Sequence, residues 1–363
     1  MSGTWGKNIH YSIFGESHGE GLGIVIDGLP SGFKLDLEEI MFEMNRRRPG
    51  KSSVETPRKE ADEFQILSGY FQDKTTGAPL CIIIRNQNKQ SKDYEEIKNT
   101  MRPGHADFTA FMKYKGFHDY RGGGHFSGRL TAPIVFAGAV TKQILKTKGI
   151  LIGSHIYQIG RVFDRSFDKV EVSEEVLQML VRKEFPLLDE SRASEMKDLI
   201  LSAKEERDSV GGVVEAAIIN LPAGLGNPFF DSVESCLSHL LFSIPAVKGL
   251  EFGSGFEMAS MRGSEANDPF YVDKDVVKTS TNHNGGILGG ITNGMPLIFR
   301  AVFKPTPSIG NPQNTIDISR KVDKEIKIEG RHDPCIVPRA VPVVEAMAAM
   351  GILDLLLDEI HIN

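Results

Sequence analysis

The first regular features of the chain are two short apolar runs followed by a helical period. The runs Ile9–Phe14 and Gly23–Asp27 predict two strands that flank a glycine-bounded loop. Apolar residues then recur with helical spacing over Leu35–Arg48. This predicts a helix that Asp36 caps and that ends before Pro49.

Later in the chain, strand-like and helix-like apolar runs are mixed without the regular spacing of βαβ units. We therefore expect an α+β fold rather than a doubly wound α/β sheet. No Pro-, Gly- or Ser-rich linker divides the chain, so one domain over residues 1–363 is predicted. The charged, amphipathic stretch 172–207 contains no site-like motif and predicts an exposed helical excursion. The predicted strands are Leu80–Arg85, Gly211–Asn220 and Leu297–Phe303, and the predicted helices are Ala132–Lys146, Val172–Glu184, Ser191–Arg207, Asp231–Ser243 (capped by Asp231) and Val341–Ile360.

Composition narrows the classes of function. The 363 residues are 40% apolar and 25% charged, as in ordinary globular proteins, and the net charge of −6 argues against a general nucleic-acid-binding surface. Three widely spaced cysteines show no disulfide or metal-site spacing, which favours a reducing compartment and predicts no metal site. Residues 1–18 contain no signal-peptide core, and runs such as Ala132–Val140 are too short to cross a bilayer. We therefore expect a cytoplasmic protein with neither a membrane nor a nucleic-acid partner.

Five of the ten histidines lie in short glycine-bounded windows, most of which also contain arginine. Imidazole titrates near neutral pH, guanidinium binds phosphate or carboxylate through paired donors, and glycine lets backbone N–H groups approach an anion. We expect one site, assembled from many loops, that binds an anionic ligand and transfers protons. The windows are Gly15–Gly19, Arg102–Asp107, Arg121–His125, Asn282–Gly286 and Gly330–Pro334.

Two glycine-rich segments are candidates for ligand contact. Arg121–Thr131 has three successive glycines before a helix, like a phosphate cradle, although it lacks the ending of a Walker loop. A flexible loop with a helix cap is the alternative for this segment. Asn282–Gly290 lacks a dinucleotide fingerprint, and it suits either a flat ring against bare backbone or a tight hairpin.

Three basic segments complete the candidate chemistry. In Arg46–Arg48, one or two arginines are candidate anion clamps, and a solvated helix face is the alternative. Lys304–Ser308 is a rigid run with one cation and two hydroxyls, which suits a ligand phosphate. Gly330–Cys335 places Arg331, His332 and Asp333 on one turn, an arrangement suited to proton transfer.

Taken together, these segments resemble the chorismate synthase family over essentially the whole chain. Nine family motifs occur in order. They are Gly15–Gly19, Arg46–Gly50, Arg102–Asp107, Asp119–Gly124, Asp208–Gly212, Ala246–Gly253, Asn282–Gly290, Lys304–Thr306 and Gly330–Cys335.

The resemblance implies a carbon–oxygen lyase acting on a phosphate ester. The implied reaction is the 1,4-anti elimination of phosphate and a C6 proton from 5-enolpyruvylshikimate 3-phosphate, which gives chorismate in the last step of the shikimate pathway. It also implies dependence on reduced FMN (FMNH2), a homotetramer, and a β-α-β sandwich with helices between two antiparallel sheets. No nicotinamide cradle is visible in the sequence, so we expect an external flavin reductase, with NADPH only as an indirect reductant.

The same resemblance implies roles for individual residues. His18 matches the histidine that assists phosphate departure, and His105 the one that protonates or polarises the reduced flavin. Asp333 matches the aspartate that relays a proton near flavin N5, with Ser127 close by. The implied substrate-binding residues are His10, Arg47, Arg48 and Arg129. The implied cofactor-binding residues are His125, Phe126, Ser127, Pro245, Ala246, Gly289, Gly290, Lys304, Pro305, Thr306, Pro307, Ser308 and Arg331.

Several positions depart from the residues common in the family, and two other hypotheses stay open. The departures are His125, Phe126, Leu130, Pro245 and Pro307. A flavin- or nucleotide-binding regulatory protein that kept the fold and lost turnover is the first alternative. A generic phosphatase is the second, and the lack of a visible metal set or activated nucleophile disfavours it.

Overall fold

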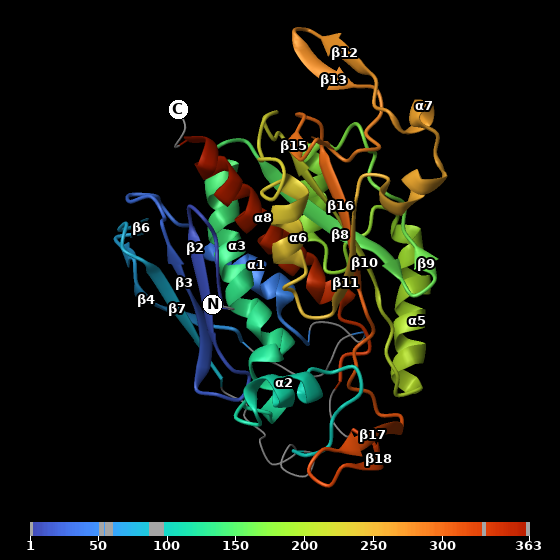
Figure 1. The fold of residues 1–363 in the computed structure, drawn as a ribbon. Coiled ribbons are helices and arrows are strands. Elements are labelled where there is room, and N and C mark those ends of the chain that lie inside the picture. The colour runs from blue at the N-terminus through green and yellow to red at the C-terminus, as the bar shows by residue number, and fades with distance from the viewer. Residues whose placement is uncertain (1–2, 51–53, 55–60, 87–97, 329–331, 361–363) are drawn as a thin grey trace.

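The structure, a computed structural model, describes residues 3–50, 54, 61–86, 98–328 and 332–360 (Figure 1). It is a sandwich of two five-stranded antiparallel sheets with helices between them. In spatial order, the first sheet contains β1 (Thr4–Trp5), β2 (His10–Gly15), β3 (Gly21–Asp27), β7 (Leu80–Arg85) and β4 (Phe64–Ser68). The second contains β11 (Val247–Phe252), β16 (Leu297–Phe303), β10 (Gly212–Ile219), β8 (Leu151–Ile159) and β9 (Val162–Phe163). The middle layer consists of α1 (Leu37–Arg47), α3 (Thr131–Lys146), α6 (Val233–Leu241) and α8 (Val337–Ile360). The predicted α+β class and β-α-β sandwich are confirmed.

The packing of the layers follows from the apolar pattern. In β3, the alternate residues Leu22, Ile24 and Ile26 are buried against the helix layer, as expected for a strand with one covered face. Helices α3 and α8 are apolar on nearly all sides because a sheet covers each side of their layer. Gly138 allows α3 and α8 to touch, since a Cβ there would lie 2.2 Å from the Ala346 Cβ.

Two predicted helix ends were wrong by a few residues. The N-cap of α6 is Ser232 rather than Asp231, because the Ser232 hydroxyl accepts a hydrogen bond from the Ser235 amide at 3.1 Å. Helix α8 begins at Val337 rather than Val341 and contains Pro342. The cap of α1 is as predicted: the Asp36 carboxylate accepts hydrogen bonds from the amides of Glu38 and Glu39.

Helix α8 is the one helix among the described residues that is long and apolar enough to cross a membrane. Its apolar window, Val337–Asp358, is 89% buried inside the fold. It packs against β8 and β10 of the second sheet and against α1, α3 and α6, so its apolarity is explained by its place in the core.

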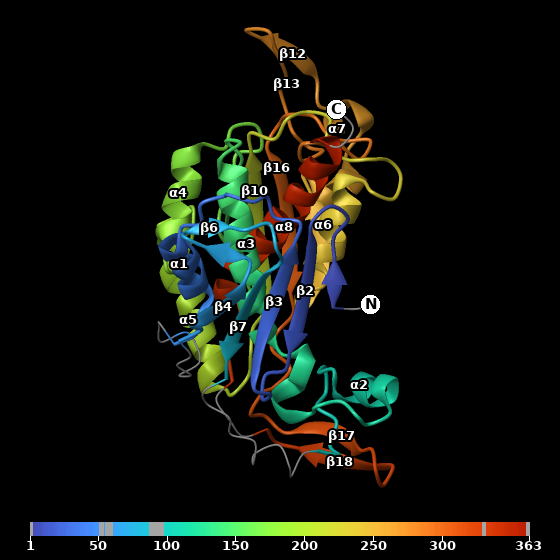
Figure 2. The ribbon, with the colours of Figure 1, turned by 90° about the vertical axis from the view of Figure 1, so that its left-hand side faces the viewer.

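The segment 172–207 forms two amphipathic helices that pack against β8 of the second sheet and lie at the same side of the molecule (Figure 2). In α4 (Glu174–Arg182), Leu177 and Leu180 are buried, while α5 (Ala193–Glu205) buries Met196 and Ile200. Each helix therefore covers the sheet with one stripe and exposes its charged side to solvent.

Smaller elements lie at the two ends of the sandwich. Among them, α2 and the hairpin β17–β18 are at the same end, and the hairpin β12–β13 projects from the other (Figure 1). These elements are α2 (Asp107–Tyr114), α7 (Gly263–Ala266), β5 (Tyr70–Phe71), β6 (Lys74–Thr75), β12 (Phe270–Asp273), β13 (Val276–Thr279), β14 (Ile287–Leu288), β15 (Ile291–Thr292), β17 (Gln313–Asp317) and β18 (Val322–Ile326), with the 3-10 turns Arg121–Phe126, Gly128–Leu130, Glu190–Arg192 and Gly255–Ser260.

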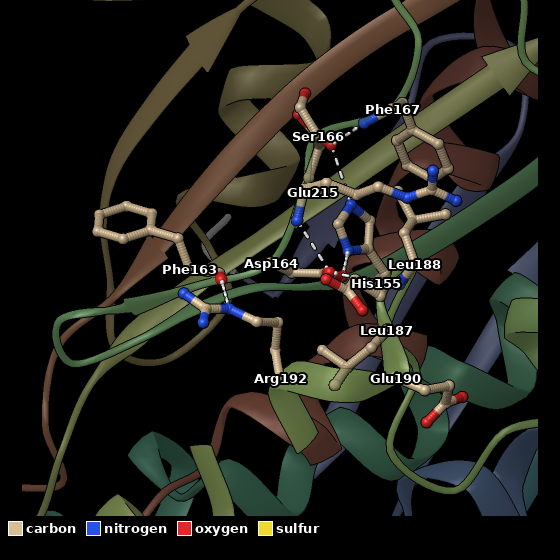
Figure 3. A network of polar contacts seen from close by, with 12 residues as sticks. His155, Phe163, Asp164, Ser166, Phe167, Leu187, Leu188, Glu190, Arg192 and Glu215 are labelled. Atoms are coloured by element: carbon tan, nitrogen blue, oxygen red, sulfur yellow. Dashed lines mark hydrogen bonds and ion pairs between the residues drawn. The ribbon is translucent and has the colours of Figure 1, made fainter. Parts of the chain in front are cut away.

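A buried charge cluster joins β8 and β10 of the second sheet to residues 164–167, which follow β9 (Figure 3). His155 on β8 donates from Nδ1 to Asp164 and from Nε2 to Glu215 on β10, both at 2.9 Å. The Glu215 carboxylate also accepts from Arg300 Nε at 2.9 Å and from Ser166 Oγ at 2.6 Å. We call His155, Asp164, Glu215 and Arg300 the closed cluster, because protein atoms engage both ring nitrogens and both carboxylates.

Candidate active site

A cavity of about 1170 Å³ lies at the end of the helix layer where α1 ends and α3 and α8 begin. Its wall also includes parts of β4 and β7, the loop before α2, and the loop between α6 and β11. Gly122, residues 126–128, residues 303–304 and residues 306–308 complete it. Most of the sequence windows therefore converge on one place, as the scattered glycine-bounded motifs predicted. The N-termini of α3 and α8 contribute partial positive charge at this wall.

The triple glycine segment holds two histidines at the cavity wall. His18 is 7% exposed, and a Cβ on Gly122 would lie 2.1 Å from its Cε1 atom. A Cβ on Gly123 would lie 3.1 Å from His105 Nε2. Gly122 and Gly123 also have φ values of 59° and 88°, which disfavour other residues. Glycine is therefore needed at both positions, for the turn and because an imidazole lies directly against each backbone.

His105 belongs to a compact group with Arg102 and Asp107. The Asp107 carboxylate accepts from His105 Nδ1 at 2.7 Å and from Arg102 Nε at 2.7 Å and Nη2 at 2.8 Å. Burial would raise the pKa of Asp107, but these hydrogen bonds hold that pKa far below its usual value. We call Arg102, His105 and Asp107 the open cluster, because one of its polar atoms is left for the cavity.

Two arginines flank a buried carboxylate at another part of the wall. Asp62, with a 1% exposed side chain, accepts from Arg47 Nη1 at 2.5 Å and from Arg129 Nη1 at 2.6 Å. Arg47 Nε also donates to Thr131, and Arg129 Nε donates to Asn86. Burial would raise the pKa of Asp62, but the two guanidinium groups keep it lowered. The Asp62 carboxylate thus holds two guanidinium groups together at this part of the wall.

A second cationic region is formed by Lys304 and Lys248. The Lys304 ammonium donates to the carbonyl oxygen of Gly104, next to His105. Burial and the nearby charge of Lys248 lower the pKa of Lys304. Thr306 lines the same region, and its buried hydroxyl has no hydrogen-bond partner among the described residues. This region offers cations and a hydroxyl to an anionic group.

Asp333 lines the cavity and is oriented by α8. Its carboxylate accepts from Arg339 Nη1 at 2.6 Å, while Arg339 Nε donates to the carbonyl oxygen of Arg47. Ser127 lines the cavity from the N-terminal side of α3 and accepts a hydrogen bond from the Arg129 amide. Asp333 and Arg47, far apart in sequence, are thus linked through one arginine.

Most of the residues named from the sequence line this cavity. They are His18, Arg47, His105, Phe126, Ser127, Arg129, Pro245, Ala246, Lys304, Thr306, Pro307, Ser308 and Asp333.

Several other named residues lie away from the cavity wall. His10 is exposed on β2, Arg48 contacts Asn45 at the end of α1, and exposed His125 bonds through Nδ1 to the Gly15 carbonyl oxygen. Pro305 is exposed and is not part of the lining. Arg331 lies outside the described residues.

Gly289 and Gly290 form the two-residue turn between β14 and β15, with φ values of 60° and 85°. The segment therefore contains the tight hairpin that was one alternative for it, and the contact of these glycines with the cofactor stays a prediction. Gly290 packs beside Ser232 at the start of α6, where a Cβ would lie 2.6 Å from the Ser232 Cβ. Neither glycine is part of the cavity lining.

Sequence reasoning missed several polar residues of the site. Asp62 and Asn86 lie outside every motif, so no local signal distinguished them from surface residues. Arg102 and Asp107 flank His105 in its window, and their spacing was the available signal. Among the described residues, no group of three or more His, Cys, Asp or Glu side chains is arranged to hold a metal ion.

Comparisons of the sequence and of the structure with known proteins point to the same family. The sequence model of one family, described as chorismate synthase, matches residues 9–357. The chain is 46% identical to chorismate synthase of Dehalococcoides mccartyi over 98% of this chain and 97% of the relative. It is 48% identical to chorismate synthase of Thermococcus kodakarensis over 97% of each chain. A crystal structure of chorismate synthase superposes with a TM-score of 0.78 at 30% identity, covering 98% of this chain and 93% of that one.

Proposed function

Because this chain belongs to the chorismate synthase family, we propose that its cavity catalyses the 1,4-anti elimination of phosphate from 5-enolpyruvylshikimate 3-phosphate to give chorismate. This reaction makes the chain a carbon–oxygen lyase and the last enzyme of the shikimate pathway. One structural observation carries the proposal: two histidines and two cationic regions from distant segments line one cavity.

The cavity supports the binding of two anionic ligands. A single ligand site commonly measures about 300–1,000 Å³, and this cavity is larger at about 1170 Å³. Arg47 and Arg129 suit the phosphate or carboxylates of the substrate, because guanidinium binds such groups through paired donors. Lys304 and Thr306, with the lining segments at 126–127 and 245–246, suit the phosphate and ring of FMN.

The residues present fit reduced FMN, which when bound would transiently supply an electron that eases phosphate departure. The protein's own part is to orient both ligands and to move protons. His18, buried against Gly122, would donate to the departing phosphate. His105 would exchange a proton through Nε2, and Asp333 would receive the C6 proton or relay it. Ser127 lines the same cavity.

The remaining features rest on the family resemblance and on the sequence. We expect a homotetramer in the cytoplasm. An external reductase would supply the reduced flavin, with NADPH as an indirect reductant.

The test is anaerobic and uses purified protein, photoreduced FMN and the phosphorylated substrate. Chorismate absorbance and released phosphate should rise in equal amounts, and only with reduced flavin. Tight FMN binding without product would favour the regulatory binding protein. Phosphate without chorismate would favour the phosphatase. His18→Ala should remove turnover and keep FMN binding, whereas His239→Ala, at an exposed histidine away from the cavity, should change neither.

A further inference from the structure

We propose that Asp107 is a positioning residue that keeps a proton on Nδ1 of His105, so that Nε2 is the ring nitrogen exchanging protons with the cavity. The use made of that proton rests on the proposed function. The tautomer itself does not, because it follows from contacts within the open cluster.

The Asp107 carboxylate cannot turn away from His105. Its Oδ2 accepts from Arg102 Nε at 2.7 Å and from the Arg102 amide at 3.1 Å. Its Oδ1 accepts from Arg102 Nη2 at 2.8 Å and from His105 Nδ1 at 2.7 Å. Four donors therefore fix both oxygens, and three of the four come from one arginine.

These contacts decide which histidine nitrogen carries the proton. Hydrogen bonds from Arg102 and His105 outweigh burial and keep the pKa of Asp107 low, so the carboxylate is ionised and only accepts. A 2.7 Å contact from Nδ1 to that oxygen requires a proton on Nδ1. Arg102 Nη2 lies 3.2 Å from Nδ1, but it is also a donor and is directed to Asp107.

The second ring nitrogen is left for chemistry. Among the described residues, His105 Nε2 makes no hydrogen bond, and the ring lies against the bare backbone of Gly123 at the cavity wall. With Nδ1–H fixed, Nε2 donates a proton as imidazolium and accepts one back as neutral imidazole. A neutral ring protonated on Nε2 would donate a hydrogen bond but could not complete this cycle.

The substitution Asp107→Asn tests the assignment because it keeps the shape and changes the donor pattern. The amide oxygen should remain with the Arg102 amide and Nε, which turns the amide NH2 toward His105. Nδ1 must then accept, and the proton should move to Nε2. Nitrogen-15 NMR of histidine-labelled, flavin-free protein reads the tautomer, and His105→Gln assigns the signal by its loss.

Activity provides the second readout. If the tautomer flips, kcat should fall roughly 100-fold, while KM changes less than about threefold. Asp119→Asn is the matched control, because Asp119 forms a similar short-range pair with Arg121 and does not contact His105. It should leave the His105 tautomer as in the wild type.

A proton that stays on Nδ1 in folded Asp107→Asn protein, with kcat unchanged, overturns the proposal. Folding is checked by thermal unfolding. If the wild type shows no lyase activity, the proposed function fails, and the NMR comparison still decides whether Asp107 sets the tautomer.

Discussion

The closed cluster on the second sheet and the open cluster at the cavity use the same residue types for different ends. In the closed cluster, carboxylates accept from both nitrogens of His155, whose side chain is fully buried. In the open cluster, Asp107 engages one nitrogen of His105 and leaves the other at the cavity. The difference teaches that a histidine–carboxylate pair becomes chemically useful only when one ring nitrogen is left over.

The arginine run at the end of α1 shows the same contrast between neighbours. Arg46 pairs with Glu43 at 2.7 Å and with Glu345 at 2.5 Å inside the helix layer. Arg47 turns to Asp62 and lines the cavity. Successive side chains on a helix point about 100° apart, so Arg46 can form an ion pair in the core while Arg47 faces the cavity as a candidate anion clamp.

The largest expected effect comes from breaking the closed cluster. His155→Leu removes the imidazole that bridges the buried carboxylates of Asp164 and Glu215. Glu215 keeps Arg300, but the buried Asp164 carboxylate loses its charged partner, and breaking a buried ion pair in this way costs about 3–5 kcal/mol of unfolding free energy. Urea denaturation measures it, and His239→Ala, at an exposed histidine, should stay within about 0.5 kcal/mol of wild type. A His155→Leu protein as stable as wild type would contradict the structural role of this cluster.

The second effect comes from the open cluster and should appear in turnover instead. His105→Ala should lower kcat by roughly 10²–10³-fold, the usual loss for a proton-transferring group. Its unfolding free energy should change by less than about 1.5 kcal/mol, since the ring borders a cavity rather than the core. Chorismate formation under anaerobic conditions gives kcat. Full activity would place the proton transfer elsewhere.

The neighbours Arg46 and Arg47 test the same contrast between a core ion pair and a cavity residue, with smaller expected effects. Arg47→Lys should raise KM for the phosphorylated substrate about tenfold, because lysine cannot contact both Thr131 and Asp62 as guanidinium does. Arg46→Lys should leave KM unchanged and lower the denaturation midpoint, because Arg46 binds the carboxylates of Glu43 and Glu345 inside the helix layer. Steady-state kinetics and urea denaturation on both variants separate the effects. A matched rise in KM for Arg46→Lys would contradict the division.

The sequence predicted the open cluster better than the closed one, for a physical reason. His105 lies in a window with glycine and arginine beside it, so local composition indicated chemistry. His155 lies in the apolar run of β8, and its partners come from Asp164 and from the neighbouring strand β10. Strand pairing between distant segments creates that cluster, and no local pattern encodes it. Asp62 was missed for the same reason.

Secondary structure was predicted well where the periodic burial of one apolar face determines the element, as in α1 and β7. The hairpin turn at Gly289–Gly290 carried a glycine signal that fits a ligand contact as well as a turn, and only tertiary placement separates the two.

The smallest expected effect is the pH dependence of stability, which the closed cluster should set. Burial would lower the pKa of His155, but hydrogen bonds to Asp164 and Glu215 raise it above its unfolded value of about 6.5. The stability contributed by His155 is therefore fully present below about pH 6.5 and is lost as the pH rises through the folded pKa. For Asp164 and Glu215, hydrogen bonds to His155 overcome the opposing effect of burial and lower the pKa, so their contribution is lost on acidification instead.

Urea denaturation of wild type and His155→Gln between pH 6 and pH 9 reads the histidine contribution alone. The wild-type free energy of unfolding should fall relative to the variant, by at most about 1.4 kcal/mol per pH unit. The cluster is buried, so 0.5 M salt should leave this difference in place, whereas surface ion pairs would be screened. Parallel curves for the two proteins would mean that folding does not shift the pKa of His155, and the contrast between the two clusters would then rest on geometry without charge.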